Sequence, residues 1–170
     1  MPGLLCEPQH DFGVHKVLRT SERNHSNLHR YQELYWLYAL GARRRDERVI
    51  PKGNDKHIEF ERDRLTSAVK RVALLSNERS RAVKFLIEKG KVEVTSSSPE
   101  LGEATEQLPV DYAGTAMQIC FNAQYVLDFL AAVATDVVSL ELKDEVSQAV
   151  MKPVGAEGYD YTYVIMPMRV

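Results

Sequence analysis

The chain has 170 residues, of which 44% are hydrophobic and 27% charged, and its 22 basic and 24 acidic residues give a formal net charge of −2. This length and apolar content suit one packed domain with an additional segment, whereas the near balance of charge argues against a small basic module that coats nucleic acid. The sequence shows no long apolar run, no export signal, and no metal or disulfide spacing between Cys6 and Cys120, so we expect a reduced, cytoplasmic protein without a membrane span.

Residues 1–47 differ in kind from the remainder of the chain. They contain four of the five histidines and no alternating strand pattern, and residues 28–45 predict a helix that ends near Gly41. The candidate metal ligands here are Cys6, His10, His15, His25 and His29. Zinc requires about four ligands around one point, and only the last two histidines have a helical spacing. We therefore expect no bound metal, and a disordered or loosely helical segment.

Residues 48–170 open with a strand, a helix and three further strands. Residues 57–61 alternate as a half-buried strand does, and residues 62–76 carry apolar side chains at helical spacing. A turn at residues 89–91 joins strands 82–88 and 91–98 in a hairpin. The last strand, residues 101–112, should be irregular because Pro109 cannot donate to a ladder. The buried helix face should consist of Leu65, Ala68, Val69, Val72 and Leu75.

The same order of elements then repeats. Residues 117–121 predict a strand, residues 122–134 a helix capped by Asn122, and residues 137–143, 147–153 and 159–168 three more strands. The two helices begin at residues 62 and 122, which indicates an internal structural repeat. Two such units predict an α+β domain with both helices on one face of antiparallel sheets.

Five stretches of residues 48–170 resemble, in order and spacing, the C-terminal domain of the bacterial DNA polymerase III beta subunit, the sliding clamp. They are RVIPKGNDKHIE, ALLSNERSRAVKF, PELGEATEQLPVDY, FNAQYVLDFL and YVIMPMRV. The resemblance implies a non-catalytic, ring-forming processivity factor without a cofactor, whose helices line the hole through which DNA passes. The implied partners are double-stranded DNA, held weakly and without sequence preference, the polymerase III alpha and clamp-loader subunits, and other proteins with a clamp-binding motif.

The chain also departs from that family. A family member has three such domains, whereas here only the last is present, and residues 1–47 do not resemble the middle domain that precedes it. Either the chain is a truncated or rearranged gene product, or it is a stand-alone paralogue. A stand-alone protein would act as a regulator or decoy that binds clamp partners, or the clamp itself, without encircling DNA.

The first helix is the candidate DNA-facing surface. Against the single acid Asp63, it carries the cations Arg62, Arg64, Lys70 and Arg71. A positive surface of this kind meets phosphates without reading bases. On sequence alone these are equally the solvated charges of an ordinary amphipathic helix, and it is the resemblance that favours the DNA-facing interpretation.

The resemblance further implies a cleft on the last domain, into which partner proteins insert a short peptide of the Gln-Leu-x-Leu-Phe type. Its apolar walls would be Val49, Val146, Val164, Met166, Pro167 and Met168, and its polar contacts would be Arg48, Asn122, Tyr125 and Arg169. The run that ends in Met168 also suits a buried strand, but Pro167 should release the strand and expose both methionines. Because the family's middle domain donates part of this cleft, we expect weak peptide binding.

Leu74 and Leu75 match the apolar pair that the family uses between subunits. Leu75 also fits the buried helix face, so Leu74 is the better interface candidate. Without a first domain to contact, this surface should favour weak self-association or association with an intact clamp. After residue 47 the sequence has one histidine, His57, and no HExxH, CxxC or glycine-rich phosphate loop, so we expect no catalysis.

Overall fold

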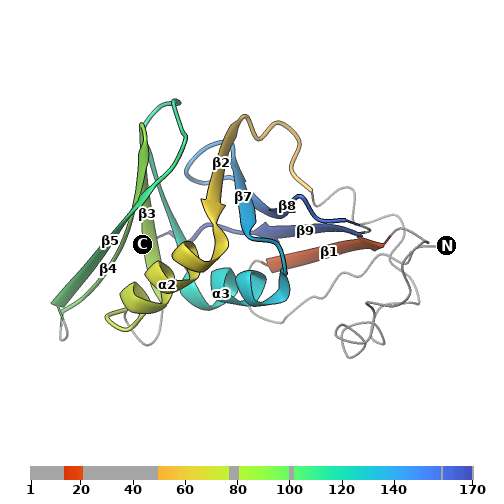
Figure 1. Ribbon diagram of the computed structural model, residues 1–170. Helices are drawn as coiled ribbons and strands as arrows, with labels where there is room; N and C mark the ends of the chain where they lie inside the picture. The colour runs from red at the N-terminus through yellow and green to blue at the C-terminus, as the bar shows by residue number, and fades with distance from the viewer. Residues whose placement is uncertain (1–13, 21–49, 77–80, 100–101, 158, 170) are drawn as a thin grey trace.

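The computed structural model describes residues 14–20, 50–76, 81–99, 102–157 and 159–169 (Figure 1). In chain order the elements are β1 (Val14–Thr20), β2 (Lys56–Glu61), α2 (Arg62–Ala73), β3 (Ala82–Glu88), β4 (Lys91–Ser98), β5 (Gly102–Pro109), β6 (Met117–Asn122), α3 (Ala123–Ala132), β7 (Val137–Leu142), β8 (Ala149–Val154) and β9 (Tyr159–Ile165). Apart from β1, they follow the predicted repeat of strand, helix and three strands.

The strands form two antiparallel sheets, and each repeat unit lends its first strand to the sheet of the other. Sheet A has the order β1-β9-β8-β7-β2, and sheet B has the order β5-β4-β3-β6. Strand β2 of the first unit thus pairs with β7 of the second, and β6 of the second unit pairs with β3 of the first. This exchange joins the units into one domain, because each sheet contains strands from both.

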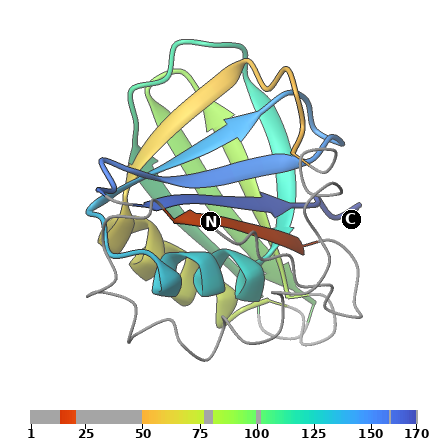
Figure 2. The ribbon, with the colours of Figure 1, turned by 90° about the vertical axis from the view of Figure 1, so that its right-hand side faces the viewer.

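Both helices lie side by side along one side of the two sheets (Figures 1 and 2). The predicted α+β architecture with its helices on one face is therefore confirmed. The N-terminus of α3 is capped as expected, since the Asn122 side-chain oxygen accepts a 2.9 Å hydrogen bond from the Gln124 N–H. The buried face of α2 consists of Leu65, Ala68, Val69 and Val72.

Helix α2 ends three residues before the predicted end of residues 62–76, at Ala73. The N–H groups of Leu75 and Ser76 donate to carbonyls only three residues back, those of Val72 and Ala73, and so close a tight final turn. This turn leaves the Leu74 side chain 76% exposed, while Leu75 is half-buried.

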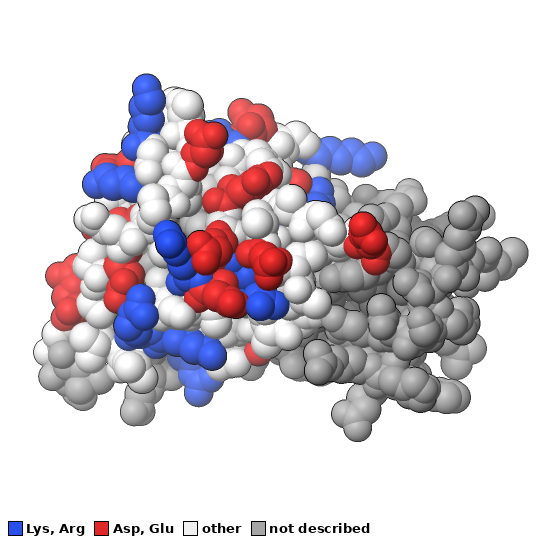
Figure 3. Space-filling view, in the orientation of Figure 1, with Lys and Arg blue, Asp and Glu red and all other residues white. Residues whose placement is uncertain are grey.

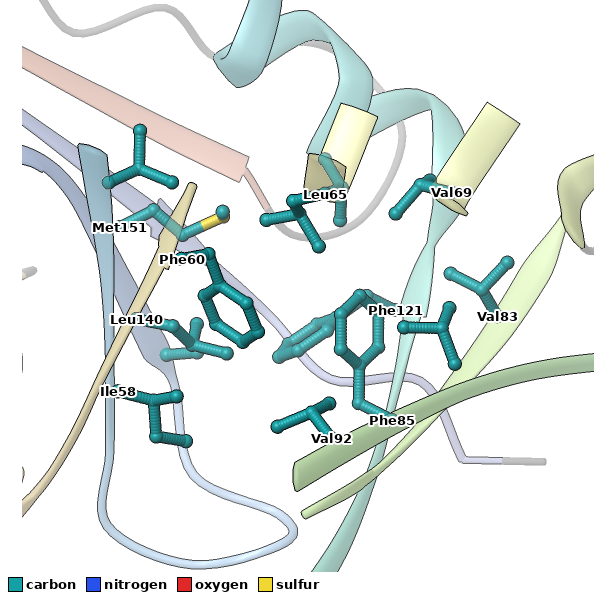
Figure 4. Close-up of a cluster of buried hydrophobic side chains, with 14 of the residues drawn as sticks. Ile58, Phe60, Leu65, Val69, Val83, Phe85, Val92, Phe121, Leu140 and Met151 are labelled. Carbon is teal, nitrogen blue, oxygen red and sulfur yellow. The ribbon is translucent and has the colours of Figure 1, made fainter. Parts of the chain in front are cut away.

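The hydrophobic core fills the space between the inner faces of the sheets and the helices. Figure 4 shows side chains converging from sheet A, sheet B and α2; those labelled are Ile58, Phe60, Leu65, Val69, Val83, Phe85, Val92, Phe121, Leu140 and Met151. Phe129 of α3 stacks on Tyr161 and packs against Tyr163, with ring centroids 5.6 and 5.4 Å apart, respectively. These aromatic contacts fasten α3 to strand β9.

Strand β1 corrects the expectation that residues 1–47 contain no strand. Val14–Thr20 pair in antiparallel register with Thr20 opposite Tyr159 and Val14 opposite Ile165, and so add a fifth strand beside β9 (Figure 2). The pattern V-H-K-V-L-R-T was missed because its charged and polar residues interrupt a two-residue alternation. The helix predicted over residues 28–45 lies outside the described residues.

None of the helices in the described ranges is long and apolar enough to cross a membrane.

Candidate functional site

The chain leaves sheet A after Ile165, and the C-terminal segment (residues 166–169) runs along the outer edge of β6. The Met168 N–H donates to the Cys120 carbonyl at 2.8 Å, which ties the segment to sheet B. Pro167, which has no N–H, precedes this bond. Met166 is 37% exposed, and Pro167 and Met168 are half-buried. The predicted release of the strand is therefore observed, and it begins one residue earlier, at Met166; the predicted exposure holds for Met166 but not for Met168, which the bond to Cys120 holds against β6.

A second connection draws the loop of residues 143–148 to the same edge of β6. The Gln118 N–H donates to the Glu145 carboxylate at 3.2 Å. The loop is folded around Asp144, which accepts hydrogen bonds from the Ser147 hydroxyl (2.8 Å) and from the N–H groups of Val146 and Ser147 (3.0 and 2.6 Å). These bonds lower the pKa of Asp144, and the bond from the Ser147 hydroxyl has the largest effect. They leave the Val146 side chain 63% exposed.

The beginning of α3 supplies the polar part of the same region. Asn122 ends β6, two residues after the carbonyl that holds Met168, and Tyr125 lies in the first turn of the helix. Both side chains are half-buried. We call the assembly the β6-edge site, and its residues are Asn122, Tyr125, Val146, Met166, Pro167, Met168 and Arg169.

Val164, a predicted wall of the cleft, is fully buried in this structure and so is not accessible. Its position in sheet A explains this burial, since it lies between Val150 of β8 and His15 of β1 in the ladders. Because it alternates with Tyr163 and Ile165, which point into the core, Val164 lies on the opposite face of sheet A, as does the buried Val150. Of the remaining predicted cleft residues, Arg48 and Val49 lie outside the described residues.

The predicted DNA-facing cations of α2 are mostly engaged with carboxylates. Arg62 contacts Asp63 at 2.9 Å, and Arg64 contacts Glu61 at 2.9 Å. Arg62 also donates to the Val133 carbonyl beyond the end of α3. Among the described residues, Lys70 has no ion pair. The count of cations along the helix overlooked Glu61, because this acid lies in the preceding strand.

Arg71 also has an acidic partner, on β5. Its guanidinium makes two hydrogen bonds to the Glu106 carboxylate, at 2.6 and 3.1 Å, which raise the pKa of Arg71 and lower that of Glu106. The pair spans an open hollow of about 390 Å³ between α2 and β5. Figure 3 shows blue and red side chains interspersed over this face, so its cations do not form a continuous positive surface.

The two leucines of the predicted interface pair differ in exposure. Leu74 is the most exposed large hydrophobic side chain in the described part of the protein, whereas Leu75 is half-buried.

Most of the candidate metal ligands lie outside the described residues, namely Cys6, His10, His25 and His29, and His15 lies on β1. Within the described ranges, no three potential metal-ligating side chains cluster.

Sequence reasoning missed the two hydrogen bonds that assemble the β6-edge site. One joins Met168 to Cys120, and the other joins Glu145 to Gln118. Each connects a loop or tail to a strand edge distant in sequence, and only a knowledge of which edge of sheet B lies open would have indicated them.

Two repeat units that exchange their first strands between two sheets, with two helices along one side, define a DNA-clamp domain. Residues 47–169 match the family described as "DNA polymerase III beta subunit, C-terminal domain". The chain belongs to this family, and the resemblance inferred from its motifs is confirmed.

Individual relatives agree with this membership. The chain is 41% identical over 123 residues to a protein of Pseudomonas putida KT2440 named "Beta sliding clamp", covering 72% of this chain and 33% of that protein. A beta sliding clamp of Escherichia coli K12 is also 41% identical, over 122 residues. The crystal structure of a DNA polymerase sliding clamp from Pseudomonas aeruginosa superimposes with a TM-score of 0.69 at 36% identity, over 73% of this chain and 34% of that one. The chain thus spans about a third of the length of these relatives.

Proposed function

We propose that the chain is a non-catalytic replication-clamp domain that binds short apolar peptides at the β6-edge site. The peptides would belong to the polymerase III alpha subunit, to clamp-loader subunits and to other proteins with a clamp-binding motif. The observation that carries the proposal is the gathering of exposed apolar side chains. Of the three large hydrophobic residues exposed in the described part of the chain, Val146 and Met166 both belong to elements tied to the outer edge of β6.

The chemistry of the site suits such a peptide. Met166 has a flexible, polarizable side chain that adapts to different apolar anchors, and Val146 offers a second apolar surface on a separate loop. Asn122, Tyr125 and Arg169 add amide, hydroxyl and guanidinium groups that can fix the orientation of a peptide backbone. The burial of Val164 removes one predicted anchor contact, so binding should be weaker than in a complete clamp.

The test is a fluorescence-anisotropy titration with a labelled peptide of the Gln-Leu-x-Leu-Phe type. Met166→Ala and Val146→Ala should each weaken binding by about tenfold, since a buried apolar contact contributes on the order of 1–2 kcal/mol. Leu74→Ala is the matched control, because Leu74 is an exposed apolar residue outside the site. If all three substitutions weaken binding equally, or none does, the peptide does not occupy the β6-edge site.

We also propose that α2 faces DNA, with weak and sequence-independent contact. Exposed ion pairs such as that between Arg64 and Glu61 contribute little to stability, so phosphates can replace their carboxylates. Lys70, which is exposed, is the most direct phosphate contact. In a ring made with complementing clamp domains, Lys70→Glu should reduce retention on DNA at low salt, whereas Lys89→Glu, in the β3–β4 turn, should not. Equal retention of both variants would contradict a DNA-facing α2.

The alternative function is that of a stand-alone regulator or decoy, and the engaged cations of α2 favour it. In this reading the chain binds clamp partners through the β6-edge site without encircling DNA. A chain that binds the peptide yet shows no salt-dependent DNA retention would support it. An upstream reading frame that encodes two clamp domains would instead mark a broken or divided clamp gene.

Self-association is the third proposal, and it concerns Leu74 and the neighbouring edge of sheet B. In the described residues β5 pairs only with β4, and the Arg71–Glu106 pair joins this strand to the last turn of α2, next to Leu74. An apolar side chain beside an open strand edge invites pairing with a second copy or with an intact clamp. Sedimentation should show a concentration-dependent dimer that Leu74→Glu abolishes, and a monomer at all concentrations would contradict it.

A further inference from the structure

Strand β9 has two neighbours, which hold it over unequal lengths. Within β9, β8 pairs only with Tyr163, Val164 and Ile165, whereas β1 pairs with all seven residues, Tyr159–Ile165. Pro153, two residues past Met151 in β8, has no N–H with which to extend the shorter ladder. Among the described strands, β1 is therefore the sole ladder partner of residues 159–162.

This support comes from a part of the chain outside the family match, which begins at residue 47. The register also places β1 at the β6-edge site. Val14 lies opposite Ile165, the last residue before the C-terminal segment, and His15 lies opposite Val164. The first residues of β1 thus flank the point at which residues 166–169 leave sheet A.

Aromatic contacts connect the β1-dependent part of β9 to the other side of the site. Tyr161, whose ladder partner among the described strands is β1, stacks on Phe129 of α3 at 5.6 Å with an interplanar angle of 22°. Helix α3 begins directly after Asn122, within the β6-edge site. Loss of order at Tyr161 would therefore loosen both the strand that leads to Met166 and the helix that presents Tyr125.

We propose that β1 is a positioning strand, whose pairing with β9 holds the β6-edge site in the form that binds peptide. Pairing of β1 with β9 and binding of the peptide are then thermodynamically coupled. This inference rests on the proposed peptide-binding function. The opposite effect, in which β1 covers Val164 and competes with the peptide, is less well supported by the structure. Val164 also has β8 as a neighbour, whereas residues 159–162 depend on β1.

Two adjacent proline substitutions in the full chain test the proposal, Val17→Pro and Leu18→Pro. Along an antiparallel edge strand, successive N–H groups point alternately toward the partner and away from it. One proline therefore removes a hydrogen bond to β9, and the other serves as a matched control. In the ladder-breaking variant alone, amide exchange at residues 159–162 should become about tenfold faster. The same variant should bind the labelled peptide about tenfold more weakly.

The outcomes separate the parts of the proposal. Unchanged exchange at residues 159–162 in both variants, or equal acceleration in both, overturns the dependence of β9 on β1. Faster exchange together with tighter peptide binding overturns the positioning role and establishes competition. If the unaltered chain does not bind the peptide, the proposed function fails and the positioning role fails with it, while the exchange data still decide whether β1 holds β9.

Discussion

Replacing Phe129 by alanine should remove the contact that fastens α3 to β9. The ring is fully buried and lies against both Tyr161 and Tyr163. Deleting a buried phenylalanine costs about 3–5 kcal/mol, and each aromatic pair adds about 0.5–1.5 kcal/mol beyond area burial. We therefore expect a loss near the upper end, about 4–5 kcal/mol of unfolding free energy. This is a large fraction of the roughly 5–15 kcal/mol of a typical domain.

Urea unfolding followed by circular dichroism measures this loss, provided that the dependence on denaturant is unchanged. Leu127→Ala, at a half-buried position on the same helix, is the control and should cost about 1 kcal/mol. A double-mutant cycle with Phe129→Leu and Tyr161→Leu should give a coupling energy of about 0.5–1.5 kcal/mol. A cost below about 2 kcal/mol for Phe129→Ala, or a coupling of zero, would refute the role assigned to this contact.

Three further predictions concern the loops. The pKa of Asp144, held below the ordinary value of 3.8, should rise toward it in Ser147→Ala, as a carboxyl titration by nuclear magnetic resonance would show. Because that folded-state pKa is depressed, the stability that Asp144 contributes is present above the ordinary value and is lost as the pH falls through the folded-state pKa. Acidification below about pH 3.8 should therefore loosen residues 143–148, seen as faster amide exchange, but not in Asp144→Asn. Gly114→Ala should destabilise the domain by about 1–3 kcal/mol in denaturant unfolding, since the new methyl would overlap the Tyr112 ring. That ring is held in place by its hydroxyl, which donates a hydrogen bond to the Thr115 carbonyl. Ala113→Gly is the control.

The repeat of elements was predictable because each helix and strand carries its own periodic signal. The buried residues of each helix, such as Val69 in α2 and Val126 in α3, recur at helical spacing, and Asn122 caps α3 locally. The elements of both units therefore follow from short stretches of sequence. The exchange of β2 and β6 between the units was not predictable, because pairing partners depend on the geometry of the whole domain. The same holds for β1, whose polar pattern gives no local indication of the edge that it joins.

In the candidate site, too, features with a local cause were predictable and features set by distant strands were not. Pro167 indicated from sequence that the last strand would leave its sheet, because proline lacks an N–H wherever it stands. The burial of Val164 goes with the place of β9 as an inner strand of sheet A, between β8 and β1, which the local sequence does not indicate. The partners of Arg64 and Arg71 come from β2 and β5, and a count of charges along one helix cannot include them.

The two edges of sheet B differ in a way that limits polymerisation. Glu145 and Met168 hydrogen-bond to backbone groups on the outside of β6, so a foreign strand would have to displace them, whereas β5 is open among the described strands. Growth of this sheet is therefore directional: two copies that meet at β5 about a two-fold axis consume each other's open edge and stop. Through sheet B, the protein should form finite pairs rather than fibres.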